Sequence, residues 1–262
     1  MNKKKMMSIF LLDFKFLFNN SFFMLTKLSH LIDLMYPKTC FSCNKQWSYL
    51  CSTCTKTLKP HSEICPVCQE RNHNYARCLS CKKSSYELEG IMIVFQYTWV
   101  VKELVATLKY QHVYTIAPWM AHKIALLIAT QPIYHTQKQS LSITSVPSHR
   151  IRKYRVKGYN QSELLAKEVA KLLSLPYLHT TKRIKRTKSQ VKLSRIKRLS
   201  NLVWAFDNLS TSSKQKEKES KTIIIIDDIT TTWATLLQIA KQIKKQHPNY
   251  KIRGAVFARH GV

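Results

Sequence analysis

A chain of 262 residues leaves room for one good hydrophobic core and one smaller module. Its 43 lysines and arginines against 14 aspartates and glutamates give a formal net charge of +29, far beyond what solubility requires. This excess favours a polyanion such as nucleic acid, or a membrane surface, as a partner. The alternative is a general lysine bias that only solvates a basic face of the protein.

The first 35 residues begin with Lys3, Lys4 and Lys5 and continue with mostly apolar and aromatic residues. Polar residues from Asp13 to Asn20 divide this stretch into pieces too short for a membrane span, and no small-residue cleavage site follows. The pattern argues against a membrane span and against a secretory signal. It predicts an N-terminal helical extension over 1–35, with a true start at Met24 as the alternative.

All eight cysteines lie in four pairs that have two residues between the partners: Cys40/Cys43, Cys51/Cys54, Cys65/Cys68 and Cys78/Cys81. Two thiolates at this spacing bind one tetrahedral ion, and two pairs complete a four-cysteine zinc site. The simplest pairing in chain order gives two structural zinc ions, and interleaved pairing stays open. Disulfides would need an oxidising compartment, and the regular pairs suit zinc better than an iron–sulfur cluster. The sequence therefore predicts a zinc-ribbon-like module over 36–88 in a cytoplasmic protein.

The remaining residues, 89–262, alternate predicted strands with predicted helices. The strands are expected at 91–97, 142–146, 222–226 and 252–258, and the helices at 104–110, 117–130, 162–173 and 236–246. This alternation predicts an α/β fold with a mostly parallel sheet and helices on both faces. The polar, low-complexity stretch 207–221 predicts a flexible loop before the central strand.

The central strand contains four consecutive isoleucines, Ile223–Ile226, and therefore reads as a strand buried on both faces. We expect it to end at Asp227 and Asp228, at the edge where open α/β sheets place their ligands. The threonine-rich turn that follows leads into a helix, whose first N–H groups can bind a phosphate. The two carboxylates can bind ribose hydroxyls or a magnesium ion. An ordinary strand-to-helix turn capped by threonine is the alternative.

The motif Asp-Asp-x-x-Thr-Thr-x-x-Thr at 227–235 resembles the phosphoribosyl pyrophosphate (PRPP) loop of type I phosphoribosyltransferases. The resemblance implies that the catalytic centre contains Asp227 and Asp228, which hold the ribose. It also implies a PRPP-binding set in which the loop wraps the 5′-phosphate and basic residues bind pyrophosphate together with Mg²⁺: Thr231, Thr232, Trp233, Ala234, Thr235, Arg152 and Lys157.

From about Leu31 onward, ordered motifs resemble the ComF/GntX family of competence-associated proteins. The motifs are Tyr36-Pro37-Lys38-Thr39-Cys40, Leu108-Lys109-Tyr110, Val146-Pro147, Gly158-Tyr159-Asn160-Gln161, a series from Arg183 to Phe206, and the PRPP loop. The resemblance implies a zinc module joined to a PRPP-binding fold that handles single-stranded DNA during natural transformation. It also suggests competence helicase or recombination proteins as partners, and it leaves open whether the phosphoribosyltransferase activity is retained and which acceptor it would use.

A second hypothesis is a non-catalytic, zinc-dependent factor that binds single-stranded DNA and has a degenerate PRPP site. Its candidate DNA contacts come from two basic blocks: Arg155, Arg183, Lys185, Arg186, Lys188, Arg195 and Arg198. A purely structural zinc-ribbon adaptor would leave the Asp-Asp-x-x-Thr-Thr motif unexplained.

Glycine occurs only four times, where ordinary composition predicts about 18 residues. Tryptophan stands at 47, 99, 204 and 233, where the family tends to have glycine. A turn that needs positive φ, or a loop that closes on a phosphate, has no room for an indole. One hypothesis explains both facts: UGA codons that the organism reads as glycine were translated as tryptophan. The alternative is genuine tryptophan in a protein that has lost PRPP binding, and UGG codons at these positions would support it.

Overall fold

The computed structural model describes residues 38–110, 114–148, 159–183, 206–208 and 221–260. The chain forms two compact units, Met1–Lys56 and Thr57–Val262. In the first unit an antiparallel bridge joins Thr39 to Gln46, and the short helix α3 spans Ser52–Lys56. The predicted extension over 1–35 lies outside the described residues.

The second unit contains the sheet and most of the helices. Its strands are β1 (Leu88–Gln96), β2 (Leu141–Ser145), β3 (Thr181–Arg183), β4 (Phe206–Asn208), β5 (Thr222–Thr230) and β6 (Lys251–Arg259). Its α-helices are α4 (Leu79–Lys82), α5 (Trp99–Tyr110), α6 (Ala117–Ala129), α7 (Pro132–Gln137), α8 (Gln161–Leu173) and α10 (Ala234–Gln246). The described residues also form three short 3-10 helices, η2 (His73–Tyr75), η3 (Tyr114–Ile116) and η4 (Lys138–Ser140).

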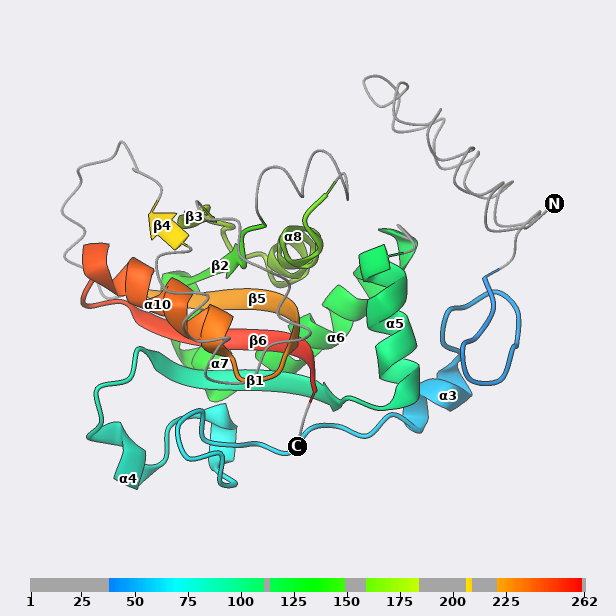
Figure 1. Cartoon of the computed structure of the whole chain (residues 1–262), viewed down its shortest axis with the longest axis horizontal. Coiled ribbons are helices and arrows are strands. Elements are labelled where there is room, and N and C mark those ends of the chain that lie inside the picture. Colours follow the sequence, from blue (N-terminus) through cyan, green and yellow to red (C-terminus); the bar gives the residue numbers. More distant parts are fainter. Residues whose placement is uncertain (1–37, 111–113, 149–158, 184–205, 209–220, 261–262) are drawn as a thin grey trace, which may run out of the picture. The chain divides into compact units, whose positions relative to one another are not determined.

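Four strands form one sheet in the order β1-β6-β5-β2, and every neighbouring pair is parallel (Figure 1). The predicted α/β fold with a mostly parallel sheet is confirmed. Two features were not predicted from the sequence: the helix α7 and the antiparallel pair β3–β4. Asp207 and Asn208 belong to β4, Lys221 directly precedes β5, and residues 209–220 of the predicted flexible loop lie outside the described part of the chain.

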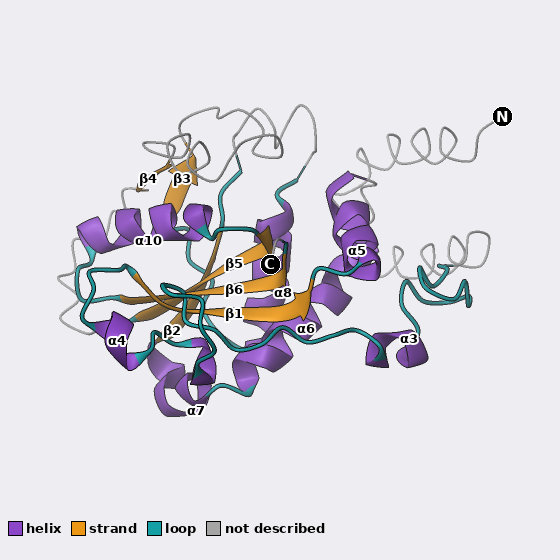
Figure 2. Cartoon of the chain, turned by 60° about the horizontal axis from the view of Figure 1, so that its bottom comes forward, coloured by secondary structure: helices purple, strands orange, loops and turns teal. Residues whose placement is uncertain are grey.

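Helices cover both faces of the sheet (Figure 2). Because side chains alternate along a strand, Ile223 and Ile225 of β5 face α10 and join the hydrophobic core beneath it. Phe257 of β6 points to the other face, where its ring lies 5.9 Å from that of Trp119 in α6. α8 packs beside α6 and contacts β2 and β5. The isoleucine run therefore has apolar neighbours on both sides, as its sequence predicts.

None of the helices in the described residues has both the length and the apolar character that a membrane span requires.

Candidate functional site

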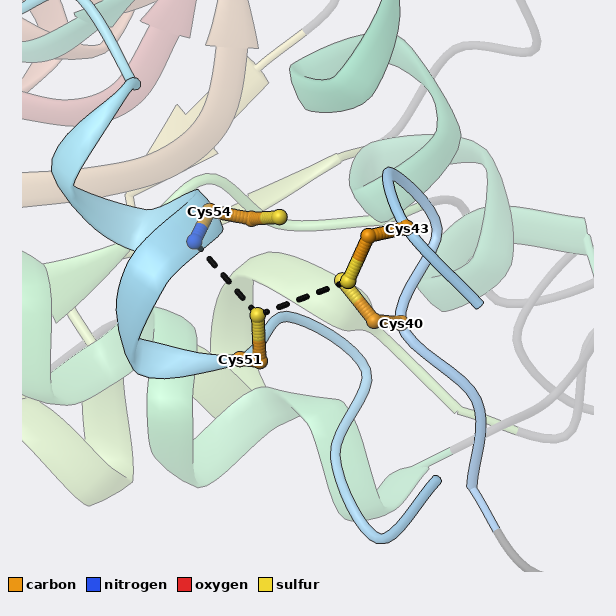
Figure 3. Close-up of side chains that lie close together, drawn as sticks. All are labelled: Cys40, Cys43, Cys51 and Cys54. Carbon is orange, nitrogen blue, oxygen red and sulfur yellow. Dashed lines mark hydrogen bonds between the residues drawn. The ribbon is translucent and has the colours of Figure 1, made fainter. Parts of the chain in front are cut away.

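The first cysteine cluster lies in the first unit and consists of Cys40, Cys43, Cys51 and Cys54 (Figure 3). The four sulfur atoms lie within 4.8 Å of one another. Cys43 Sγ and Cys51 Sγ are 3.7 Å apart, too far for a disulfide bond of about 2.05 Å. In a tetrahedral zinc site with sulfurs about 2.3 Å from the ion, the sulfurs stand about 3.8 Å apart. The donor set and its spacing therefore fit a zinc ion.

The second cysteine cluster lies in the second unit and consists of Cys65, Cys68, Cys78 and Cys81, whose sulfurs also lie within 4.8 Å of one another. Cys68 Sγ and Cys78 Sγ are 3.8 Å apart, the tetrahedral spacing again. The cysteine pairs thus combine in chain order, first with second and third with fourth. Interleaved pairing, which the spacing left open, does not occur in these two clusters.

Backbone N–H groups turn toward a sulfur in both clusters. Cys54 N donates to Cys51 Sγ at 3.4 Å, and Val67 N and Cys78 N donate to Cys65 Sγ at 3.5 and 3.4 Å. Burial raises the pKa of the Cys65 thiol, but backbone hydrogen bonds from Cys78, Cys68 and Val67 outweigh burial and lower this pKa to about 7. A pKa this low favours the thiolate, the form of cysteine that binds metal.

The two aspartates lie near the carboxyl end of β5, but the strand does not end at them. Ile229 and Thr230 continue the ladder by pairing with Ala258 and Arg259 of β6. The expected end of the strand at Asp227 and Asp228 is therefore wrong by two residues, because the backbone of β6 offers partners as far as Thr230. The consequence is that both carboxylates are held on the rigid strand itself.

Each carboxylate has a partner from a different helix. Ser162 Oγ, in the first turn of α8, donates to Asp227 Oδ1 at 2.6 Å, and Lys109 Nζ, in the last turn of α5, lies 2.9 Å from Asp228 Oδ1. Asp228 is only 3% exposed, and its second oxygen, Oδ2, has no hydrogen-bond partner among the described residues. A buried carboxylate oxygen without a donor is costly, and a ribose hydroxyl or a metal ion would satisfy it.

Burial raises the pKa of Asp227 to about 7, and the neighbouring charge of Asp228 adds to the rise. Lys109 and Ser162 act in the opposite direction without reversing it. A raised carboxyl pKa is what a poorly solvated site with a second negative charge beside it produces. Perturbed carboxyl pKa values of this kind are frequent at ligand sites.

The loop after β5 runs from Thr231 to Trp233 and leads into the N-terminus of α10. Thr231, Thr232 and Thr235 are partly exposed, whereas Trp233 is 5% exposed and packs in the core beneath α10. The indole Nε1 donates to Tyr86 Oη at 3.1 Å, and the Arg259 guanidinium lies 4.6 Å from the ring centroid. The side chain thus turns into the core, which corrects the expectation that the loop has no room for an indole. The backbone nevertheless adopts φ 42°, in the left-handed region.

Trp47, between the two cysteine pairs of the first cysteine cluster, also has a left-handed backbone, with φ 77°. Trp99 begins α5 and is 60% exposed, and Trp204 lies outside the described residues. Two of the four tryptophans at expected glycine positions therefore have the backbone conformation that glycine adopts without strain. Trp119, which is not one of the four, lies within α6 and packs on Phe257.

Replacing Trp47 by glycine should strengthen the first cysteine cluster. A left-handed backbone costs an L-residue about 1–2 kcal/mol, and Trp47 is 62% exposed, so little packing is lost. We expect the zinc-loaded cluster to gain about 1 kcal/mol, measured as slower metal loss to a chelator. Trp47→Ala keeps the Cβ atom and should show no gain. Equal gains in both variants would mean that backbone strain is not the cause.

Of the predicted DNA contacts, only Arg183 lies in the described part of the chain, on β3. Arg155, Lys185, Arg186, Lys188, Arg195 and Arg198 lie outside it, as do Arg152 and Lys157 of the predicted PRPP-binding set. Ser162 was not singled out from the sequence, and Lys109 appeared there only as part of a family motif. The sequence gives no sign that Ser162 and Lys109 contact the aspartates, because helix ends that are far apart in the chain meet β5 only in the folded protein.

No protein-family model matches the chain. A curated relative does: the chain is 30% identical to "Competence protein F" of Haemophilus influenzae over 198 residues, which cover 75% of this chain and 84% of the relative. The matched length spans most of both proteins, and the cysteine clusters and the parallel sheet agree with the resemblance that the sequence motifs indicate. The chain therefore belongs to the ComF/GntX family, the family of competence protein F.

Proposed function

We propose that this protein binds PRPP with Mg²⁺ and acts in DNA uptake and natural transformation, as the name of its relative suggests. The observation that carries the PRPP site is the carboxylate pair on β5. Asp228 is buried, its Oδ2 atom has no partner among the described residues, and Asp227 beside it has a raised pKa. A ligand that brings hydroxyl donors or a cation would complete this site.

The 5′-phosphate of PRPP has suitable partners in the loop and the helix that follow β5. The partly exposed threonines Thr231, Thr232 and Thr235 and the first N–H groups of α10 suit the 5′-phosphate, because a helix N-terminus combines free donors with a positive dipole end. Arg152 and Lys157 are the proposed partners of the pyrophosphate. Mg²⁺ would supply charge neutralisation on that leaving group.

If the protein is an active phosphoribosyltransferase, Asp227 and Asp228 act as its catalytic residues by orienting the ribose and offsetting the positive charge that develops at C1. The low-dielectric setting of the pair makes this electrostatic effect stronger than it would be in water. Part of this effect depends on Asp227 losing its proton, which its raised pKa delays until about neutral pH.

The cysteine clusters have a structural role in this proposal. We propose that residues 36–88 form the zinc module, that residues 89–262 form the phosphoribosyltransferase-like domain, and that each cluster holds one zinc ion. Eight cysteines gathered in two clusters without a disulfide bond suit a reducing compartment, so we place the protein in the cytoplasm. There it would meet single-stranded DNA and the helicase or recombination proteins of transformation.

Calorimetric titration of PRPP with Mg²⁺ tests the site. Asp228→Asn should weaken binding roughly 10- to 100-fold, the loss expected when a hydrogen bond to a charged group is removed. Asp207→Asn is the matched control, because this aspartate lies on β4 at a half-exposed site, where its carboxylate lies 3.6 Å from Lys182 Nζ. If wild type and Asp228→Asn bind PRPP with equal affinity, and circular dichroism shows that both are folded, the carboxylate pair is not part of the PRPP site.

A second candidate function is a non-catalytic single-stranded DNA-binding factor with a degenerate PRPP site. The packing of Trp233 favours it, since a strained residue in the loop can hold the backbone away from the geometry that a phosphate needs. In that case Asp227→Asn with Asp228→Asn leaves DNA binding intact, and neither the wild type nor Trp233→Gly binds PRPP. PRPP binding by the glycine variant alone would instead indicate that tryptophan is not the native residue at 233.

A further inference from the structure

A groove of about 560 Å³ lies between the segment that follows the second cysteine cluster and the C-terminal half of α10. The cluster side provides Arg77, Lys82 at the end of α4, and Ser84 to Glu87. The α10 side provides Lys241, Lys244, Lys245 and Pro248. We call it the basic groove.

Five of the ten residues that line the basic groove are lysine or arginine, and only Glu87 is acidic. In the whole chain about one residue in six is basic, so the groove is about three times richer in cations than the protein at large. Glu87 offsets one of these five charges, since its carboxylate forms an ion pair with Lys241 Nζ at 3.9 Å. Arg77 is already engaged by Glu89, with both carboxylate oxygens 3.0 Å from Nη2.

The three lysines of α10 stand at positions i, i+3 and i+4, so they share one face of the helix with Cβ atoms about 5–6 Å apart. Lysines in the last helical turn also complement the helix dipole, which alone would account for Lys244 and Lys245. The dipole of α10 does not account for Lys82, which reaches the same groove from a segment more than 150 residues earlier in the chain, and α4, which contains Lys82, is only four residues long. Like charges gathered from two segments repel each other unless an anion lies between them.

The basic groove is separate from the carboxylate pair. Glu87 precedes the first residue of β1, and Lys244 and Lys245 lie in the last turn of α10, so the groove lies at the amino ends of the strands. α4 and the last turn of α10 are seen at this same end of the sheet in both views (Figures 1 and 2). The carboxylates lie near the carboxyl end of β5, and the start of α10, which follows that end in the chain, is about 15 Å from Lys244 along the helix.

We propose that the basic groove binds the phosphodiester backbone of a single-stranded nucleic acid. A row of flexible lysines along a helix, faced by a further lysine, suits a chain of phosphates better than one compact anion. The inference deepens the DNA handling in the proposed function and rests on it. It assigns the contact to described residues outside the two basic blocks that the sequence suggested.

The test compares two triple variants that remove the same charge. The groove variant carries Lys82→Gln, Lys244→Gln and Lys245→Gln. The control carries Lys59→Gln, Lys102→Gln and Lys171→Gln, all at exposed positions outside the groove, and Lys171 occupies the last turn of α8 as Lys244 does in α10. Fluorescence anisotropy with oligodeoxythymidylate and with oligouridylate, over a range of salt concentrations, gives the affinity and its salt slope for each strand type.

The groove variant should bind at least roughly tenfold more weakly at low salt, and its salt slope should fall by about 2, since each lost phosphate contact removes about 0.7 for a single strand. The control should stay within about twofold of the wild type. If affinity for both oligonucleotides falls, the groove binds the phosphodiester backbone that DNA and RNA share. If affinity for only one falls, the groove binds that nucleic acid. Equal losses in the two triple variants would overturn the proposal. PRPP titrations of the groove variant should match the wild type, so failure of the groove and failure of the PRPP site are told apart.

Discussion

Cys65→Ser should remove one of two bound zinc ions and destabilise the sheet-containing unit by about 3 kcal/mol or more. This is a modest share of the 10–16 kcal/mol that structural zinc contributes in small zinc-binding peptides. For a unit of this size, 3 kcal/mol corresponds to a drop in melting temperature of about 6–12 °C. Metal content by atomic emission and thermal unfolding followed by circular dichroism measure the two effects.

The physical reason lies in how the second cysteine cluster is joined to the sheet. Ile64, next to Cys65, belongs to the core beneath α10. Ala76 forms a bridge with Gly90 of β1, where any side chain would clash with the carbonyl oxygen of Tyr75. Arg77 N donates to the Glu89 carbonyl at 3.1 Å, beside the ion pair of their side chains. Loss of the metal would release a segment that covers one edge strand of the sheet.

Cys51→Ser is the matched control for Cys65→Ser. Both sulfurs accept a backbone N–H bond, but Cys51 belongs to the first unit. Its substitution should also remove one zinc ion and leave the melting temperature of the sheet within about 2 °C of the wild type. If the two substitutions lower that temperature equally, the clusters do not support separate units.

The sheet could be predicted from the sequence because its signal is local. The four isoleucines Ile223–Ile226 place apolar side chains on both faces of the strand, so the sequence predicts burial on both faces. The structure confirms this prediction. The pair β3–β4 could not be predicted in this way. Its strands have three residues each and lie in polar, basic sequence, so the pairing depends on contacts between distant segments.

The cysteine spacing predicted the metal-binding residues but not which cysteine pairs share a cluster. A tight pair with two residues between its cysteines is a local turn, whereas the choice between chain-order and interleaved pairing depends on the path of the chain between pairs. The carboxylate pair shows the same division. The motif identified Asp227 and Asp228, but their contacts with Ser162 and Lys109 come from helix ends that the sequence alone does not bring together.

The free energy of unfolding should fall as pH rises from about 4 to about 7, by on the order of 3 kcal/mol, because of Asp227 alone. The folded-state pKa of Asp227 is raised to about 7 from an ordinary value of 3.8. Between these pH values the folded protein holds a proton that the unfolded chain releases. The stabilisation that this proton gives is therefore fully present below pH 3.8 and is lost as the pH rises through about 7. Asp227→Asn should abolish this slope and be more stable than the wild type at pH 8.

Denaturant unfolding of zinc-loaded protein at several pH values measures this slope as a difference between wild type and Asp227→Asn. The difference cancels other titrating groups, such as His61, whose pKa is lowered by burial and whose contribution has the opposite sign. Asp207→Asn, at a half-exposed site on β4, should follow the wild type. Parallel curves for wild type and Asp227→Asn would mean that Asp227 ionises normally.

The ionised form that is unfavourable in the free protein is the form that can bind ribose hydroxyls or Mg²⁺. PRPP affinity should therefore rise with a midpoint near pH 7, even though the second ionisation of a phosphate, near pH 6, also contributes. Ser162→Ala separates the two causes. Because Ser162 Oγ donates to Asp227 Oδ1 and lowers its pKa, losing this bond should move the midpoint of binding to higher pH, while the ligand ionises as before. An unchanged midpoint in Ser162→Ala would assign the pH dependence to the ligand and leave Asp227 outside the binding equilibrium.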